Sequence, residues 1–220
     1  MTHDRTLDYA SHLDDRNRAH RLTTPPANLL EQSRFWTPSR QVLDQGREGA
    51  CVGHGVTHEY GASPVRGDVS NELAHAVYKR AQQLDPWPGE QYDGTSVRAG
   101  MLAGRERGWW LGFSWAFNMV ELRAALELGP VVVGVEWLSD MYTAPGGIVT
   151  VGGQVVGGHC LLLTGYTPRH RGLDGPAYRW RNSWSATYGR NGSAYIAAAD
   201  LNRILFQAGG EAAVPVDRRA

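Results

Sequence analysis

The segment Asp44-Gln45-Gly46-Arg47-Glu48-Gly49-Ala50-Cys51 carries the strongest signal in this 220-residue chain. A glutamine precedes a cysteine by six positions, and two glycines between them permit tight backbone turns. The pattern after this turn predicts a helix over residues 51–60. A cysteine at the start of a helix lies at the positive end of the backbone dipole, which favours its thiolate form. Cys51 is therefore a candidate nucleophile.

Two later segments carry groups that a thiol nucleophile needs, Gly157-Gly158-His159 and Asn182-Ser183-Trp184. An adjacent imidazole lowers the pKa of a thiol and holds its proton, so His159 is the candidate acid and base. We expect Asn182 to accept a hydrogen bond from the other ring nitrogen and so orient the ring. We expect Trp184 to cover that hydrogen bond.

Gln45 has a separate expected task. When a thiolate adds to a carbonyl group, the oxygen becomes an anion and needs hydrogen-bond donors. The side-chain amide of Gln45 and the backbone N–H of Cys51 are the candidate donors.

Composition excludes several classes of protein. Apolar residues make up 42% and charged residues 20%, which is usual for a globular protein. Lys plus Arg and Asp plus Glu both number 22, so no net charge favours nucleic acid or an anionic membrane. The first twenty residues lack the apolar run of a signal peptide, and no run elsewhere reaches about 18 apolar residues. Two cysteines form no disulfide framework, so we expect a cytoplasmic protein.

The chain divides into three parts. We expect an arm or loose leader over residues 1–26, a helical lobe with the nucleophile over 27–116, and a β-rich lobe with His159 and Asn182 over 117–220. The expected helices are 51–60, 71–83, 96–108 and 118–128, and the expected strands are 131–135, 147–151, 160–166, 178–181 and 193–196. Helices followed by strands predict an α+β fold with the site between the lobes.

Taken together, these motifs resemble the papain-like (family C1) cysteine peptidases, in patches from Trp36 to Tyr195. The resemblance implies a two-lobe fold with a helical first lobe, a β-barrel-like second lobe and an active-site cleft between them. It implies the catalytic residues Cys51, His159, Asn182 and Gln45. Asp93-Gly94-Thr95 resembles the loop that pairs with extended substrate, and the implied substrate-binding residues are Gly49, Gly94, Thr95, Gly158 and Trp184.

The chain departs from the family pattern at several positions. Glu48 replaces a disulfide cysteine, Val52 replaces an aromatic residue, Ser185 replaces a glycine and Cys160 replaces a small residue. We expect no long inhibitory propeptide before the catalytic unit. The arm is a candidate for self-trimming or for covering the cleft.

Other features have plainer interpretations. His54 and His58 are four residues apart on one helix face, but no third ligand accompanies them, so we predict packing and no metal site. Cys160 alternates with His159 along its strand and should point into the core. We expect no cofactor, and the sequence indicates no oligomeric state.

The sequence therefore predicts a thiol peptidase that cleaves an extended polypeptide through an acyl-enzyme, without nucleic-acid or membrane partners. Two alternatives remain open. A transpeptidase or acyltransferase would pass the same acyl group to an amine, and a relative without activity would bind a peptide and leave it intact.

Overall fold

The computed structural model describes residues 5–12, 14–22, 27–89 and 91–219. Its α-helices are α1 (Cys51–Gly61), α2 (Asn71–Leu84), α3 (Val97–Glu106), α4 (Met119–Leu128) and α5 (Ala198–Asn202), which a π-turn over Arg203–Gln207 extends. Short 3-10 helices span Asp15–His20, Ala27–Glu31, Ser139–Tyr142 and Pro145–Gly147. Nothing in the described part of the chain is a helix long and apolar enough to cross a membrane.

The four main helices begin where the sequence predicts them, because polar side chains cap three of them. The side chains of Ser70, Ser96 and Asn118 accept hydrogen bonds from the backbone N–H groups three residues later. The helix α1 has no side-chain cap, and Ala50 precedes it. The first N–H groups of α1 are thus left for other partners.

The strands of the described residues form one antiparallel sheet in the order β2-β7-β3-β4-β5-β6, and β1 pairs with β4. They are β1 (Arg34–Phe35), β2 (Trp110–Trp115), β3 (Val131–Leu138), β4 (Val155–Thr167), β5 (Ala177–Arg181), β6 (Ser193–Ala197) and β7 (Glu211–Arg218). The predicted α+β class is confirmed. The sheet has two open ends, so it is a barrel only in a loose sense.

One predicted strand is wrong. Residues 147–151 form no strand, because Gly146 and Gly147 have φ values of 65° and 80°, outside the extended region. Only Ile148 makes an isolated bridge, to Tyr195. The sequence also missed β2 and β7, which lie beside each other in the sheet.

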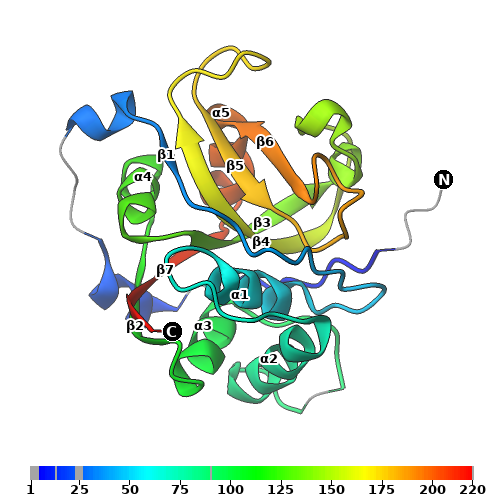
Figure 1. Ribbon diagram of the computed structural model, residues 1–220. Coiled ribbons are helices and arrows are strands. Elements are labelled where there is room, and N and C mark those ends of the chain that lie inside the picture. Colours follow the sequence, from blue (N-terminus) through cyan, green and yellow to red (C-terminus); the bar gives the residue numbers. More distant parts are fainter. Residues whose placement is uncertain (1–4, 13, 23–26, 90, 220) are drawn as a thin grey trace.

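The sheet separates two apolar cores. Along β4, Leu161 and Leu163 pack on the face that also holds Trp137 and Trp180, whereas Cys160 and Leu162 pack with α1 and α3. Cys160 is fully buried, as predicted. Figure 1 shows the helices α1, α2 and α3 gathered below the sheet and the chain near the N-terminus running between the two parts.

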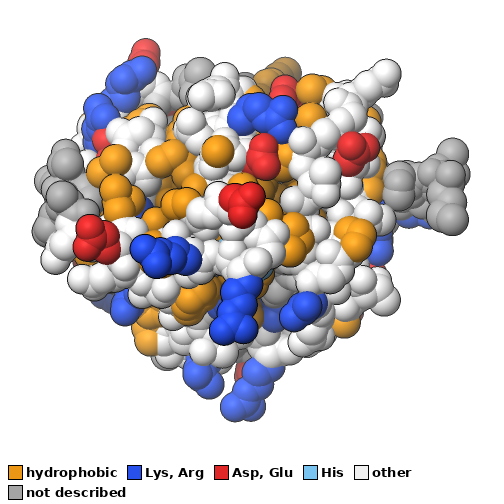
Figure 2. Space-filling model, turned by 90° about the horizontal axis from the view of Figure 1, so that it is seen from above, with side chains coloured by type: hydrophobic (Ala, Val, Ile, Leu, Met, Phe, Trp, Pro, Cys, Tyr) orange, Lys and Arg blue, Asp and Glu red, His pale blue; other side chains and the backbone are white. Residues whose placement is uncertain are grey.

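Charged side chains of both signs are scattered over the face above the sheet, with apolar side chains between them (Figure 2). Acidic and basic side chains are interspersed over the middle of this face, whereas those along its lower edge in the view are mostly basic. The predicted lack of a nucleic-acid partner stays a prediction.

Close packing of α1 on α2 yields a stability test. A Cβ at Gly53 would lie 2.3 Å from the carbonyl oxygen of Ala74 and 2.7 Å from the Cβ of Tyr78. Gly53→Ala should therefore lower the free energy of unfolding by about 1–3 kcal/mol, measured by urea denaturation. A Cβ at Gly112 meets nothing within 4 Å, so Gly112→Ala is the control and should change stability little. Equal effects of the two substitutions would contradict the packing.

Candidate active site

Cys51 is the first residue of α1 and is fully buried. Burial raises the pKa of its thiol to about 11, and the backbone N–H groups of Cys160, Asp8 and Val52 counteract part of that increase. Two of these neighbours are informative. Cys160 follows His159 directly, so α1 brings the thiol to the histidine segment of β4. Asp8 belongs to the N-terminal arm.

His159 and Asn182 form the predicted pair. The distance from His159 Nε2 to Asn182 Oδ1 is 2.8 Å. The same Oδ1 accepts the backbone N–H of Ser183 at 2.7 Å, which identifies this atom as the amide oxygen. An oxygen only accepts, so Nε2 carries the ring proton and Nδ1 of the neutral ring is left as an acceptor. Nδ1 is buried and has no hydrogen-bond partner among the described residues.

Aromatic rings enclose this imidazole. The ring centroids of Trp137 and Trp184 each lie 4.7 Å from that of His159, and Tyr142 stacks on Trp184 at 5.5 Å. Trp184 therefore covers part of the imidazole ring, and its expected role in substrate binding stays a prediction. Burial lowers the pKa of His159 to about 4, while the hydrogen bond that the ring donates to Asn182 acts in the opposite direction. Thiol and imidazole are both neutral at pH 7 in this closed arrangement.

Gln45 accepts a hydrogen bond through its side-chain oxygen and donates through its side-chain nitrogen. Its Oε1 accepts the Ser183 hydroxyl at 2.8 Å, and its backbone N–H donates to the Ser183 carbonyl at 2.9 Å. Its Nε2 donates to the carbonyl oxygens of Glu48 at 2.9 Å and Thr6 at 3.2 Å. The amide of Gln45 thus already holds a peptide carbonyl.

That carbonyl comes from the arm, in which Asp8 and Tyr9 make isolated β-bridges to Gly158 and Thr95. The N–H of Tyr9 donates to the carbonyl of Gly158 at 3.0 Å, and the N–H of Ala10 donates to that of Thr95 at 3.2 Å. The arm runs parallel to both partner segments. Two of the residues implied as substrate-binding therefore pair with the backbone of the chain's own arm.

Glycines make this approach possible. A Cβ at Gly49 would lie 2.5 Å from Oδ2 of Asp8, and a Cβ at Gly94 would lie 1.7 Å from the backbone oxygen of Asp8. Gly94 also has a φ of 88°. A side chain at Gly94 would close the space that the arm occupies.

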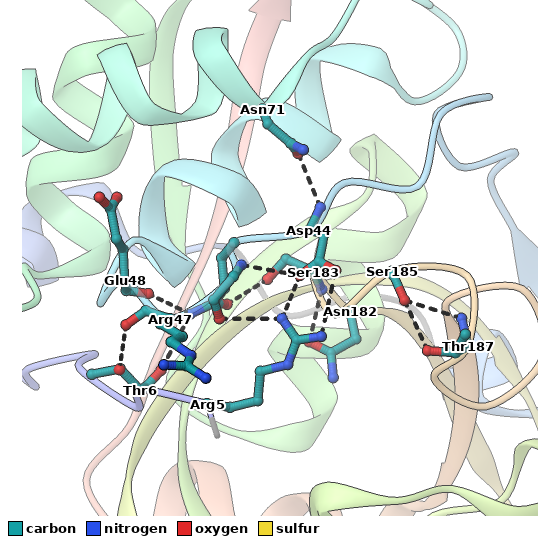
Figure 3. Close-up of polar contacts among 12 residues, drawn as sticks. Arg5, Thr6, Asp44, Arg47, Glu48, Asn71, Asn182, Ser183, Ser185 and Thr187 are labelled. Carbon is teal, nitrogen blue, oxygen red and sulfur yellow. Dashed lines mark hydrogen bonds and ion pairs between the residues drawn. The ribbon is translucent and has the colours of Figure 1, made fainter. Parts of the chain in front are cut away.

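The arm is anchored beyond the cleft by polar contacts (Figure 3). The Arg5 guanidinium pairs with the carboxylate of Asp44 and donates to the carbonyl oxygen of Gly46 at 3.1 Å. The Thr6 hydroxyl donates to the carbonyl oxygen of Arg47. All these partners lie in the turn that precedes the nucleophile.

The segment is thus ordered where the sequence indicated a loose leader. The backbone of the arm pairs with residues that are distant in the sequence. Such pairing produces no periodic pattern in the local sequence, so the pattern could not indicate it. Residues 1–4, 13 and 23–26, which include the expected boundary at 26, lie outside the described residues.

The two helix histidines pack as expected. Nδ1 of His54 lies 2.9 Å from the carbonyl oxygen of Ala50, and Nδ1 of His58 lies 2.7 Å from the Ser39 hydroxyl. Both residues are buried. Among the residues described, no group of three or more His, Cys, Asp or Glu side chains is placed to hold a metal ion.

Comparisons with known proteins agree with this architecture. No family model matches the chain, and no curated protein matches its sequence. Xylellain, a cysteine protease from Xylella fastidiosa, is similar in structure with a TM-score of 0.69 at 17% identity, over 97% of this chain and 96% of that one. A recombinant stem bromelain precursor has a TM-score of 0.65 at 11% identity, over 90% and 76%. Bromelain from Ananas comosus, in complex with the E64 inhibitor, has 0.58 at 15% identity, over 82% and 94%. The chain has a papain-like fold.

Within this papain-like fold, the structure bears on one of the departures. Ser185 adopts a φ of 62°, the left-handed conformation that favours the glycine expected there from the resemblance.

Sequence reasoning missed three residues of this region: Asp8, Tyr9 and Glu211. The alternation Leu7-Asp8-Tyr9 is a short strand signal that was available in the arm. Glu211 begins a strand that the pattern did not indicate, so its place beside the cleft could not be foreseen.

The raised pKa of Cys51 predicts slow alkylation of the folded chain. Below a pKa of about 11 the thiolate fraction falls tenfold per pH unit, so reactivity should be lowest at acidic pH and rise steadily toward pH 10. At pH 7, iodoacetamide should modify Cys51 at least tenfold more slowly in the folded chain than in urea. Mass spectrometry of the modified peptide measures both rates. Faster modification in the folded chain at pH 6–7 would contradict a covered, neutral thiol.

Proposed function

We propose that this chain is a cysteine peptidase whose own residues 5–10 hold it in a latent state. The observation that carries the proposal is the position of the Thr6 carbonyl, which the amide of Gln45 holds beside the Cys51 segment. The cleft therefore binds an extended peptide backbone next to a buried thiol. The papain-like fold and the His159–Asn182 hydrogen bond support the same chemistry.

In the proposed reaction, the arm leaves and a substrate takes its place. Cys51 transfers its proton to Nδ1 of His159, and its sulfur attacks the scissile carbonyl carbon. The new C–S bond forms while the carbonyl oxygen becomes an anion, which Gln45 Nε2 and the Cys51 N–H stabilise. The C–N bond then breaks, and His159 gives the proton to the departing amine. Water, deprotonated by His159, hydrolyses the thioester and restores the thiol.

The arm itself is not positioned for this attack. Gln45 holds the carbonyl of Thr6, whereas the sulfur of Cys51 is near the N–H of Asp8, two residues further on. The donor group and the nucleophile thus face different peptide units, and a near-attack geometry requires both at one carbonyl group. By covering the site, the arm also keeps the Cys51 thiol and the His159 imidazole neutral, because burial raises the pKa of the thiol and lowers that of the imidazole.

Loss of the nucleophile or of the oxyanion donor tests the chemistry. Cys51→Ala should abolish cleavage of an unstructured polypeptide such as casein, and Gln45→Ala should reduce kcat by about 10²- to 10³-fold. Gln91→Ala, at an exposed position on a loop, is the control and should leave kcat unchanged. Cleavage that persists in Cys51→Ala would contradict the proposal.

A second test addresses latency. Arg5→Ala removes the ion pair with Asp44 and should raise peptidase activity and Cys51 alkylation a few-fold, because a partly exposed ion pair contributes little energy. Arg16→Ala removes a similar pair with Asp14 outside the cleft and should change neither rate. Equal effects of the two substitutions would contradict autoinhibition by residues 5–10.

The reaction products distinguish hydrolysis from the two alternatives, an acyltransferase and a peptide-binding relative. An acyltransferase would give amide products when an amine is added, and mass spectrometry detects them. A peptide-binding relative would show no turnover even with Arg5→Ala. No contact among the described residues favours either alternative over hydrolysis.

A further inference from the structure

Three arginine side chains line a hollow at the end of the sheet where β5 pairs with β6 (Figure 1). This arginine hollow has a volume of about 270 Å³. Arg179 and Arg181 come from β5, and Arg190 comes from the turn before β6. The hollow shares no lining residue with the cleft described above, so it is a separate feature of the molecule.

The sheet supplies two of the cations and two hydroxyl groups. Arg179 and Arg181 lie on one face of β5, because they alternate with residues that pack in an apolar core. Directly opposite them on β6 are Tyr195 and Ser193, which also line the hollow. Opposite residues of an antiparallel pair project from the same face of the sheet. Two guanidinium groups and two hydroxyl groups therefore share this face.

Arg190 adds a third guanidinium group from an exposed position. Its side chain passes over Gly147, where a Cβ would lie 2.8 Å from the Arg190 Cγ. The missing side chain at Gly147 leaves room for this approach. The hollow thus combines buried cations with one that solvent reaches.

Carbonyl oxygens hold the two arginines of β5 in place. Arg181 is 3% exposed, and it donates through Nη1 to the carbonyl of Asn191 and through Nη2 to that of Ser39 at 3.3 Å. Nη2 of Arg179 donates to the carbonyl oxygen of Trp36 at 2.7 Å. These partners are neutral, so they fix the guanidinium groups without cancelling their charge.

The positive charge of the hollow has no counterion. None of the ion pairs between described residues includes Arg179, Arg181 or Arg190. Nε of Arg181 is buried and has no hydrogen-bond partner among the described residues. Burial, together with the charge of Arg179, lowers the pKa of Arg181 to about 10, so the side chain is still a cation at pH 7. A buried cation without a counterion costs free energy, which an anion in the hollow would recover.

We propose that the arginine hollow binds a phosphate group, with Arg179, Arg181 and Arg190 as its cationic contacts. A guanidinium group presents its N–H groups in a planar fork that matches the oxygens of a phosphate. A phosphate group carries about −1.5 to −2 charges at pH 7, which suits three cations better than the single charge of a carboxylate does. The inference goes beyond the proposed function, since binding here requires no cleavage.

The contrasting explanation is that carbonyl oxygens satisfy the two buried arginines and that Arg190 is only a surface residue. Thermal denaturation of the full-length chain separates the two explanations. Inorganic phosphate at about five times its dissociation constant should raise the denaturation midpoint by about 2–4 °C over sodium chloride of equal ionic strength. Equal midpoints in the two salts would overturn the proposal.

Substitutions locate the binding, which calorimetry with inorganic phosphate measures. Arg190→Gln should weaken phosphate binding about tenfold, because it removes a charged hydrogen-bond donor from an exposed position and leaves the fold intact. Arg181→Gln should weaken binding as well, and circular dichroism checks that this variant is folded. Arg107→Gln, at the exposed end of α3, is the matched control and should bind phosphate as the parent chain does. Unchanged binding in Arg190→Gln, or an equal loss in Arg107→Gln, would overturn the proposal.

Two further probes define the ligand. Acetate should bind more weakly than phosphate, and equal binding of the two anions would overturn the assignment of a phosphate group. Phenyl phosphate is then compared with inorganic phosphate in the parent chain and in Arg190→Gln. Binding of either probe that depends on Arg190 supports the proposal. Tighter binding of phenyl phosphate identifies a phosphomonoester as the ligand, whereas tighter binding of inorganic phosphate identifies the free ion.

Discussion

The close contact between α1 and β4 is the constraint on which the candidate site depends. Gly55, one turn after Cys51, packs against Cys160, and a Cβ at position 55 would lie 3.0 Å from the Cys160 sulfur. The helix can approach the strand this closely because Gly55 has no side chain. The approach brings the start of the helix to Cys160, the residue after His159, and the side chains of Cys51 and His159 are both fully buried.

The same contact has an electrostatic consequence. Complete burial favours the neutral forms of both groups, which raises the pKa of Cys51 and lowers that of His159. The dipole of α1 and the neighbouring N–H groups oppose this effect on the thiol without overcoming it. A charged pair therefore requires water or substrate polarity in the cleft. In the proposed latent state, covering by residues 5–10 is then more than a steric block, because it also removes the solvation that ionisation needs.

The arm and the cleft fit each other through backbone contacts as well as side chains. Gly158 and Thr95 supply carbonyl acceptors from opposite walls, and Gly49 and Gly94 leave the space between them. Such contacts accept many sequences, since every residue has a backbone. Tyr9 adds a side-chain contact, because its hydroxyl donates to Oε2 of Glu211 at 3.1 Å.

The sequence by itself determined the α+β class, the start of each main helix and the pairing of His159 with Asn182, because these depend on local capping, periodicity and short motifs. Ser70, Ser96 and Asn118 cap helices through contacts within three residues, which a linear pattern contains. Only the tertiary structure decided that β7 joins the sheet, that residues 5–10 occupy the cleft and that Glu211 lies below Tyr9. The two are 202 positions apart, and a contact over such a separation is produced by packing that no local pattern encodes.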